Sequence, residues 1–283
     1  MPQKLTSIDH DRYVVGLTYV YPVISRRAGG LSIGINFNPN NACNWRCIYC
    51  QVPDLKKGAA PNIEFKTLEH ELNNFLADVL EGDFYQRFNV PDAQRVIKDI
   101  AISGNGEPTS VKEFAKAITV IGECATKWSV LPQANFVLIT NGSFIHRQDV
   151  QHGLKRLKDY QGEIWFKVDS ATSEGISLIN NSSMSPQAQF SKLITATHLC
   201  QTKLQTCFVN YQHQGLLDSE KQAYLTLIQR LKPLNLINEI MLYTIERQSF
   251  QKEAVDLEKM PFETLESLAN EIRELGFHVS VSG

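Results

Sequence analysis

The segment Glu163-Ile-Trp-Phe-Lys-Val-Asp169 decides between two fold classes for this chain. Ile164, Phe166 and Val168 alternate with charged or aromatic residues, so a strand here has one apolar face and one mostly polar face. The apolar face suits contact with helices. A polar inner face is unusual in a packed core, but it suits a cavity that holds a charged ligand. The segment therefore favours a barrel built from β/α units.

Strand-like and helix-like segments alternate on both sides of this segment. We predict strands at 31–37, 96–102, 135–139, 164–168, 204–209 and 239–243, with one more strand-like segment at 277–281. We predict helices at 67–80, 111–127, 148–160, 185–201, 219–231 and 262–275. This alternation is typical of βαβ units and a parallel sheet.

The six β/α units predict an open α/β architecture, a (β/α)6 partial TIM barrel, with a doubly wound sheet as the alternative. In both architectures functional residues lie at the carboxyl ends of the strands. We expect a single domain over residues 1–283, in which 1–30 form a lead-in and 31–283 form the barrel.

The composition excludes several classes of protein. The chain has 283 residues, of which 43% are hydrophobic and 20% are charged, so it is neither disordered nor fibrous. The net charge of −2 means that any contact with nucleic acid requires a local basic patch. No apolar run approaches the ~20 residues of a membrane-spanning helix, and no signal peptide is visible. We therefore expect a cytoplasmic protein without membrane contact.

Three cysteines fall within the segment Cys43-Asn-Trp-Arg-Cys47-Ile-Tyr-Cys50, directly after the first predicted strand. In a cytosolic chain this spacing is more typical of metal ligands than of disulfides. Structural zinc sites and iron–sulfur clusters with a full set of cysteines both use four ligands, so three thiolates leave one iron free to bind another molecule. A zinc site completed by a distant His or Cys is the alternative. The other cysteines are expected to be ordinary buried thiols: Cys124, Cys200 and Cys207.

The CxxxCxxC spacing, with Tyr49 before the last cysteine, resembles the signature of the radical S-adenosylmethionine (radical SAM) superfamily. The resemblance implies the open six-unit barrel of that family and a [4Fe-4S] cluster held by Cys43, Cys47 and Cys50. S-adenosylmethionine (SAM) chelates the fourth iron in that family. The reduced cluster cleaves SAM to methionine and a 5′-deoxyadenosyl radical, which abstracts hydrogen from the substrate. An electron donor such as flavodoxin or ferredoxin is implied as a partner.

A second motif, Ser103-Gly-Asn-Gly-Glu-Pro-Thr109, follows the second predicted strand and resembles the family's Gly-Gly-Glu segment, which contacts the SAM amino group. Glycines let the backbone approach a ligand closely, and Glu107 can accept hydrogen bonds from an ammonium group. The alternative is an ordinary Gly-rich turn before a helix.

The ends of the third and fourth predicted strands give weaker support. Thr140-Asn141-Gly142 resembles the family's TNG turn, with a plain turn as the alternative. Lys167 and Asp169 end the fourth strand, where the family places polar groups against the SAM carboxylate and ribose; a structural ion pair is the alternative. Asn210 is a further candidate for contact with the adenosyl group. The cofactor-binding residues implied are Tyr49, Gly104, Asn105, Gly106, Glu107, Thr140, Asn141, Lys167, Asp169 and Ser170.

The segment 21–36, which includes Ser25-Arg26-Arg27, is similar to the lead-in of an Fe–S oxidoreductase branch related to the tRNA wyosine-synthesis enzymes. The resemblance covers roughly residues 21–170. Ser25-Arg26-Arg27 is either a solvated basic stretch or a cluster-side or phosphate-binding segment. The chain has no cysteine before Cys43, whereas wyosine synthases use extra N-terminal cysteines for a second cluster.

These observations favour a radical SAM enzyme that acts on a compact substrate, a small molecule or a short peptide, rather than on tRNA. The basic residues near the predicted barrel mouth form no extended stripe: Arg26, Arg27, Arg46, Lys56 and Lys57. A tRNA base-modifying enzyme and a catalytically inactive iron–sulfur protein are the alternatives.

Overall fold

The structure, a computed structural model, describes Leu5 and residues 14–25 and 29–283, so Arg26 and Arg27 lie outside the described residues. An eight-stranded sheet with the order β1-β2-β5-β6-β7-β8-β10-β12 forms its centre. β1 is antiparallel to β2, and the other neighbours are parallel. The strands are β1 (Val20–Ser25), β2 (Gly30–Asn36), β5 (Ile97–Ser103), β6 (Asn135–Thr140), β7 (Glu163–Lys167), β8 (Gln201–Cys207), β10 (Ile237–Tyr243) and β12 (His278–Ser282).

Helices connect the parallel strands. They are α1 (Phe65–Leu80), α2 (Phe84–Arg87), α3 (Phe114–Lys127), α4 (Gln148–Asp159), α5 (Ser173–Asn180), α6 (Pro186–Leu199), α7 (Asp218–Leu231) and α8 (Phe262–Glu274). In the described part of the chain, none of them is both long and apolar enough to cross a lipid bilayer.

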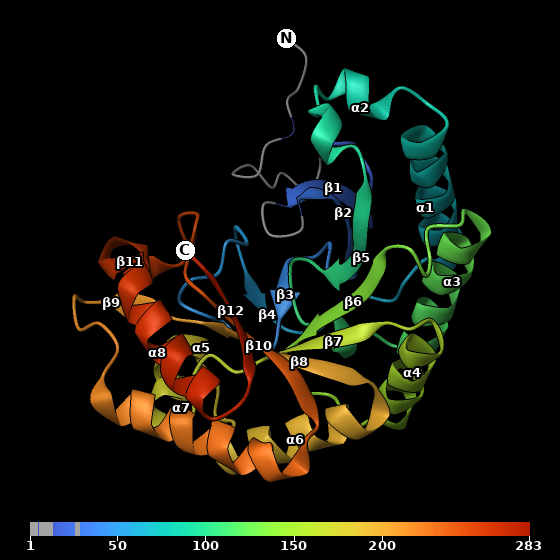
Figure 1. The fold of residues 1–283 in the computed structure, drawn as a ribbon. Helices are drawn as coiled ribbons and strands as arrows, with labels where there is room; N and C mark the ends of the chain where they lie inside the picture. The colour runs from blue at the N-terminus through green and yellow to red at the C-terminus, as the bar shows by residue number, and fades with distance from the viewer. Residues whose placement is uncertain (1–4, 6–13, 26–28) are drawn as a thin grey trace.

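The strand order is sequential, so each crossover moves in the same direction across the sheet. Because such crossovers are right-handed in nearly all proteins, this order places the helices on one face. Figure 1 shows α1, α3, α4, α6, α7 and α8 along the outer side of the curved sheet. A doubly wound sheet requires the order to reverse, so that alternative is wrong. The parallel α/β sheet is confirmed, and the exact six-unit partial barrel stays a prediction.

Short elements lie beyond the ends of the main strands. β3 (Ala42–Cys43) pairs with β4 (Lys56–Lys57), and β9 (Val209–Tyr211) pairs with β11 (Leu257–Lys259). The 3-10 helices are η1 (Asp92–Gln94), η2 (Pro108–Ser110), η3 (Lys232–Leu234) and η4 (Lys252–Asp256). β3 and β4 form a separate small sheet, which brings Ala42 and Cys43 next to Lys56 and Lys57.

The two faces of β7 differ as its sequence predicts. Ile164, Phe166 and Val168 are fully buried in the main hydrophobic core, which the helices share. The other face carries charged groups: Lys203 Nζ lies 3.1 Å from a carboxylate oxygen of Glu163 and 3.1 Å from one of Glu239. The inner face of the sheet is therefore polar, and Lys203 on β8 offsets part of the negative charge of the carboxylates on β7 and β10.

β1 and α5 are among the elements that were not predicted, and one helix begins later than predicted. β1 forms the antiparallel edge of the sheet within the predicted lead-in, and α5 follows β7. α3 begins at Phe114 rather than at 111, because Glu113 has a φ of 55° and cannot continue a right-handed helix. Asp149 then accepts the N–H of Phe114 at 2.6 Å, which satisfies a free donor at the start of the helix.

Gly34 of β2 lies opposite Tyr21 of β1, and an added Cβ would lie 2.1 Å from the tyrosine ring. We expect Gly34→Ala to lower the free energy of unfolding by about 1–3 kcal/mol, because the packed ring must move. Equilibrium unfolding in urea measures this. Gly58→Ala is the control, since its nearest contact would be 3.4 Å away, and its stability should change by less than about 0.5 kcal/mol. Equal stabilities of the two variants would contradict the packing argument.

Candidate active site

The three motif cysteines lie on one loop that follows β2, here called the cysteine loop (residues 43–50). Cys43, Cys47 and Cys50 are partly exposed free thiols. Among the described residues, no three His, Cys, Asp or Glu side chains gather closely enough to hold a single metal ion. A single zinc ion would require thiolates roughly 3.8 Å apart, given its ~2.3 Å bonds to sulfur. The assignment of the three thiols as metal ligands stays a prediction.

One side of the cysteine loop is fixed to the end of α5. The backbone N–H of Arg46 donates to the carbonyl of Asn180 at 3.1 Å, and that of Ile48 donates to Ile179 at 2.8 Å. The side-chain amide of Asn180 donates to the sulfur of Cys47 at 3.3 Å. The end of this unpredicted helix therefore sets both the path of the loop and the surroundings of one thiol.

The other side of the loop is fixed to a segment far along the chain. Ser249 Oγ lies 3.1 Å from the carbonyl of Cys50, which also accepts the N–H of Phe250 at 2.9 Å. Arg46 donates to both carboxylate oxygens of Glu253, at 2.7 and 2.8 Å. This two-bond geometry is a strong form of ion pair. It raises the pKa of Arg46 and lowers that of Glu253.

Asp169 is a buried carboxylate on which four separate segments converge. It accepts the hydroxyl of Tyr49 in a short hydrogen bond and the side-chain amide of Asn180 at 2.8 Å. It also accepts the backbone N–H of Cys207 at 3.1 Å, and Lys167 Nζ lies 3.4 Å away. A buried carboxylate is tolerated only when it is paired and hydrogen-bonded, so these contacts depend on one another.

Lys167 forms the ion pair that the sequence offered as an alternative to SAM binding. Its ammonium group also lies 3.3 Å from the hydroxyl of Tyr243 and 5.2 Å from the centre of the Tyr49 ring. Burial opposes the charged form, but Asp169 and Tyr243 hold the pKa of Lys167 well above its ordinary value. The amine therefore stays protonated, and its contact with SAM stays a prediction.

Glu107 is held by two turns that follow neighbouring strands. Oε1 accepts the N–H of Thr109 at 3.0 Å, the hydroxyl of the same residue, and the hydroxyl of Thr140 at 2.6 Å. Oε2 accepts the N–H of Asn141 at 2.7 Å. Burial raises the pKa of Glu107, and these hydrogen bonds act in the opposite direction. Oε1 is saturated, so only Oε2 has a lone pair left for a further donor.

The glycines around Glu107 serve the packing of the protein itself. An added Cβ at Gly106 would lie 2.1 Å from the carbonyl oxygen of Ala42, and one at Gly104 would lie 2.4 Å from Asn36 Oδ1. Gly104 also has a φ of 121°. Asn105 donates its N–H to the same Asn36 oxygen at 3.0 Å. These glycines therefore let the turn pack against the chain that leads into the cysteine loop, and their close approach to a ligand stays a prediction.

The remaining predicted residues lie in three different places. Asn141 donates to Asn44 in the cysteine loop at 3.0 Å, so the TNG turn contacts that loop. Ser170 Oγ accepts the N–H of Thr172 at 3.1 Å and thus belongs to the turn that begins α5. Asn210 lies beyond the end of β8 and bonds to Glu258 at 2.7 Å.

The cysteine loop contacts the residues around Glu107, here called the Glu107 group, and those around Asp169, here called the Asp169 group. Burial raises the pKa of the Cys43 thiol to about 12, against hydrogen bonds from the backbone N–H groups of Trp45 and Glu107. Burial also raises the pKa of Cys47, and the charge of Asp169 adds to that effect. The charge of Cys50 also raises the pKa of both thiols, as a smaller contribution. Neutral thiols of this kind must lose a proton to bind metal, so binding would be pH-dependent.

The donor set fits an iron–sulfur cluster with an amino-bearing ligand. Thiolates are the ligands that iron–sulfur clusters use. Among the described residues, three buried amide oxygens beside the cysteine loop lack a hydrogen-bond donor: Asn38 Oδ1, Asn105 Oδ1 and Asn180 Oδ1. Buried acceptors without donors are costly, so they favour a bound ligand that carries N–H groups.

Sequence reasoning missed the residues that hold the loop in place. Asn180 lies in a helix that was not predicted, and Ser249 and Glu253 are about two hundred residues from the loop. Cys207 was expected to be an ordinary buried thiol, but it ends β8 beside Asp169. The one feature of the sequence that could have indicated this location is the position of Cys207 near the end of a predicted strand.

We expect Asp169→Asn to lower the free energy of unfolding by about 3–5 kcal/mol, because it leaves the Lys167 ammonium buried without its partner. Equilibrium denaturation measures this. The control is Asp159→Asn, which breaks an exposed pair with Arg156 and should cost less than about 1 kcal/mol. A cost for Asp169→Asn as small as that of the control would refute the central role of this carboxylate.

Comparisons with known proteins address the fold. No protein-family model matches the chain. A GTPase Obg of Brachyspira hyodysenteriae and a UPF0026 protein of Helicobacter pylori are each 28% identical to it, over 136 and 137 residues. Each match covers 47% of this chain, and the matches span 17% and 38% of those relatives' lengths. The sequence contains no GxxxxGK[ST] phosphate-binding motif.

Solved structures resemble the chain over most of its length. A radical SAM methyltransferase from Sphaerobacter thermophilus aligns with a TM-score of 0.57 and 10% identity, covering 95% of this chain and 70% of that one. TYW1 with a lysine-pyruvate adduct aligns at 0.53 and 14%, covering 86% and 73%. HydG, a maturase of the [FeFe]-hydrogenase, aligns at 0.54 and 10%, covering 85% and 49%. The chain therefore has the fold of the radical SAM enzymes.

Proposed function

We propose that the chain is a radical SAM enzyme whose cluster is held by Cys43, Cys47 and Cys50. The observation that carries the proposal is the position of the cysteine loop at the carboxyl end of β2, between the Glu107 and Asp169 groups. The likeness of fold to radical SAM enzymes supports the proposal. The sequence motif, taken alone, also predicted a cysteine loop directly after this strand. A bound [4Fe-4S] cluster with SAM supplies one-electron cleavage of SAM and hydrogen abstraction from a substrate.

In this proposal the residues of the chain bind SAM and orient the cysteine loop. Glu107 Oε2 accepts the amino group of SAM, and Asn105 Oδ1 is a second acceptor in the same turn. Tyr49 and Asn180 keep the loop in register with the sheet through Asp169. Lys167 contributes a fixed positive charge, and its ion pair with Asp169 keeps that charge tolerable in a buried place.

The substrate proposed is compact, a small molecule or a short peptide, and the electron comes from a donor such as flavodoxin or ferredoxin. The net charge of −2 supports a compact substrate, since a tRNA requires several phosphate contacts. The fold likeness to TYW1 favours the second candidate, a tRNA base-modifying enzyme. An inactive iron–sulfur protein is the third, and formation of 5′-deoxyadenosine from SAM under reducing, anaerobic conditions would separate it from both enzymes.

We expect Cys43→Ala, Cys47→Ala and Cys50→Ala each to remove most of the iron and sulfide from protein reconstituted without oxygen, because each removes one of three thiolate ligands. Iron and sulfide analysis measures this. Cys124→Ala is the matched control, since its thiol is buried in the core and lies outside the cysteine loop. Full iron content in all three loop variants would show that the ligand assignment is wrong.

We expect Glu107→Gln to weaken SAM binding by about tenfold or more, the effect of losing one charge-assisted hydrogen bond. Because Oε1 accepts three donors and Oε2 accepts one, the new amide NH2 takes the Oε2 position, where it loses the bond from the Asn141 N–H and repels an ammonium group. Calorimetry of SAM binding measures the change, and iron content should not change. Thr109→Val is the control: it removes one donor from Oε1, leaves Oε2 intact, and should retain SAM affinity. Unchanged affinity in Glu107→Gln would remove this role.

A further inference from the structure

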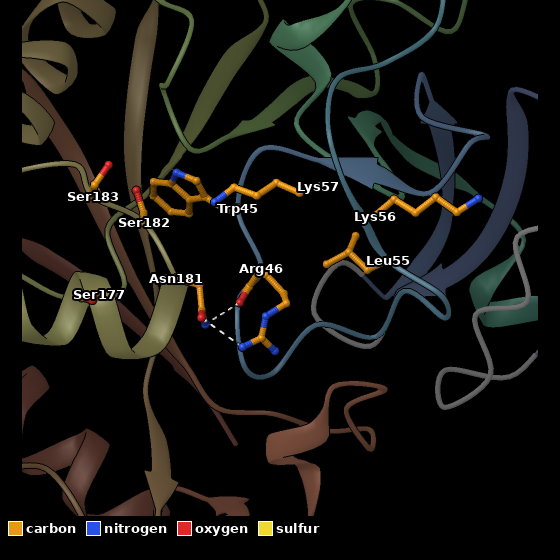
Figure 2. Close-up of a pocket in the computed structure, with 9 residues that line it drawn as sticks. All are labelled: Trp45, Arg46, Leu55, Lys56, Lys57, Ser177, Asn181, Ser182 and Ser183. Carbon is orange, nitrogen blue, oxygen red and sulfur yellow. Dashed lines mark hydrogen bonds between the residues drawn. The ribbon is translucent and has the colours of Figure 1, made fainter.

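Two adjoining pockets open beside the cysteine loop, with volumes of about 400 and about 530 Å3. The first is lined by residues of the cysteine loop, of the chain near β4 and of the loop after α5, as Figure 2 shows. The two pockets share five lining residues: Trp45, Lys57, Asn181, Ser182 and Ser183. Sites of roughly 300–1,000 Å3 are typical of small-molecule ligands.

The pockets are distinct from the residues proposed for the cluster and SAM. Neither Glu107, Asp169 nor any of the three motif cysteines lines them. Trp45 and Arg46, which do line the first pocket, lie between Cys43 and Cys47 in the sequence. The pockets therefore adjoin the proposed reaction centre and leave its binding groups free.

The charge of the lining is one-sided. Four cationic side chains and no carboxylate line the two pockets: Arg46, Lys56, Lys57 and Lys192. Arg46 is neutralised by Glu253, and Lys192 donates to the carbonyl of Ser143 at 2.6 Å. Lys57 is exposed and, among the described residues, pairs with no carboxylate. In a chain with a net charge of −2, this gathering of cations selects for an anion.

The neutral part of the lining is rich in hydrogen-bond donors. It contains seven amide and hydroxyl side chains: Asn44, Ser143, Ser177, Asn181, Ser182, Ser183 and Ser185. Ser143 Oγ is buried without a hydrogen-bond partner in the described structure. A phosphate group has several oxygens that accept hydrogen bonds, so it uses many converging donors, and lysine is a common point charge for it. Donors in this number favour a phosphate over a single carboxylate.

We propose that these joined pockets bind the phosphate group of a compact phosphorylated metabolite, which is the substrate. This inference rests on the proposed function, because a substrate must lie next to the cluster. Lys57 supplies an unpaired charge, and Figure 2 shows its side chain extending toward Trp45, whereas that of Lys56 points away from it. The serine side chains of the loop after α5 supply hydrogen bonds to the phosphate oxygens, whereas Asn181 is already hydrogen-bonded to Arg46.

Calorimetric titration of the reconstituted protein with inorganic pyrophosphate tests the proposal. We expect binding that weakens about tenfold or more in Lys57→Ala, since one charge-assisted contact is lost. Lys155→Ala, which removes an equally exposed lysine from α4, should bind pyrophosphate as the unchanged protein does. No binding by the unchanged protein, or equal binding by Lys57→Ala, overturns the site. Iron content and SAM affinity should be unchanged in Lys57→Ala.

Two further titrations settle the class of ligand. Citrate that binds as tightly as pyrophosphate would overturn the preference for phosphate over carboxylate. Bulk tRNA that binds tightly, with a salt dependence equivalent to about four or more phosphates, would overturn the compact substrate in favour of RNA. Pyrophosphate is also titrated into protein that lacks the cluster. This experiment distinguishes a failure of the anion site from a failure of the cluster assignment. We expect pyrophosphate to bind equally well to protein without iron. We also expect Lys57→Ala, which weakens pyrophosphate binding, to keep its full iron content.

Discussion

The buried carboxylate of Asp169 is the constraint on which the arrangement of this molecule depends. A charge removed from water must find partners of opposite charge and enough hydrogen-bond donors. Asp169 takes them from the cysteine loop, from α5, from β7 and from β8. Since β7 and β8 are fixed in the sheet, the carboxylate transmits their position to a loop that has little regular structure of its own. The loop is thus placed by the rigid part of the fold.

A second polar group works beside the first on the other flank of the loop. The Glu107 carboxylate accepts hydrogen bonds from the turns after β5 and β6. The backbone N–H of Glu107 donates to the sulfur of Cys43. The same few residues therefore build the turn and leave one lone pair on Oε2 of the buried carboxylate without a donor. The motif therefore has a structural role, and its role in binding SAM stays a prediction.

The sequence predicted the features that depend on neighbours along the chain. The strand at 135–139 and the helix at 148–160 agree with β6 and α4, because alternation and helical spacing are local patterns. The short helix α5 escaped because its eight residues lie between serine- and asparagine-rich stretches. The spacing of the cysteines identified their loop. The partners of that loop, Ser249 and Glu253, come close only through the fold, and a single sequence carries no sign of such contacts.

The bonds of Arg46 to Glu253 and of Cys50 to Ser249 join residues that are 207 and 199 positions apart in the chain. A ribosome that makes the chain from its amino end must therefore release Glu253 before the cysteine loop can reach its final shape. The three thiols are made about two hundred residues before the partners that fix their loop. A cluster that requires the finished loop would therefore be inserted only after those partners have emerged.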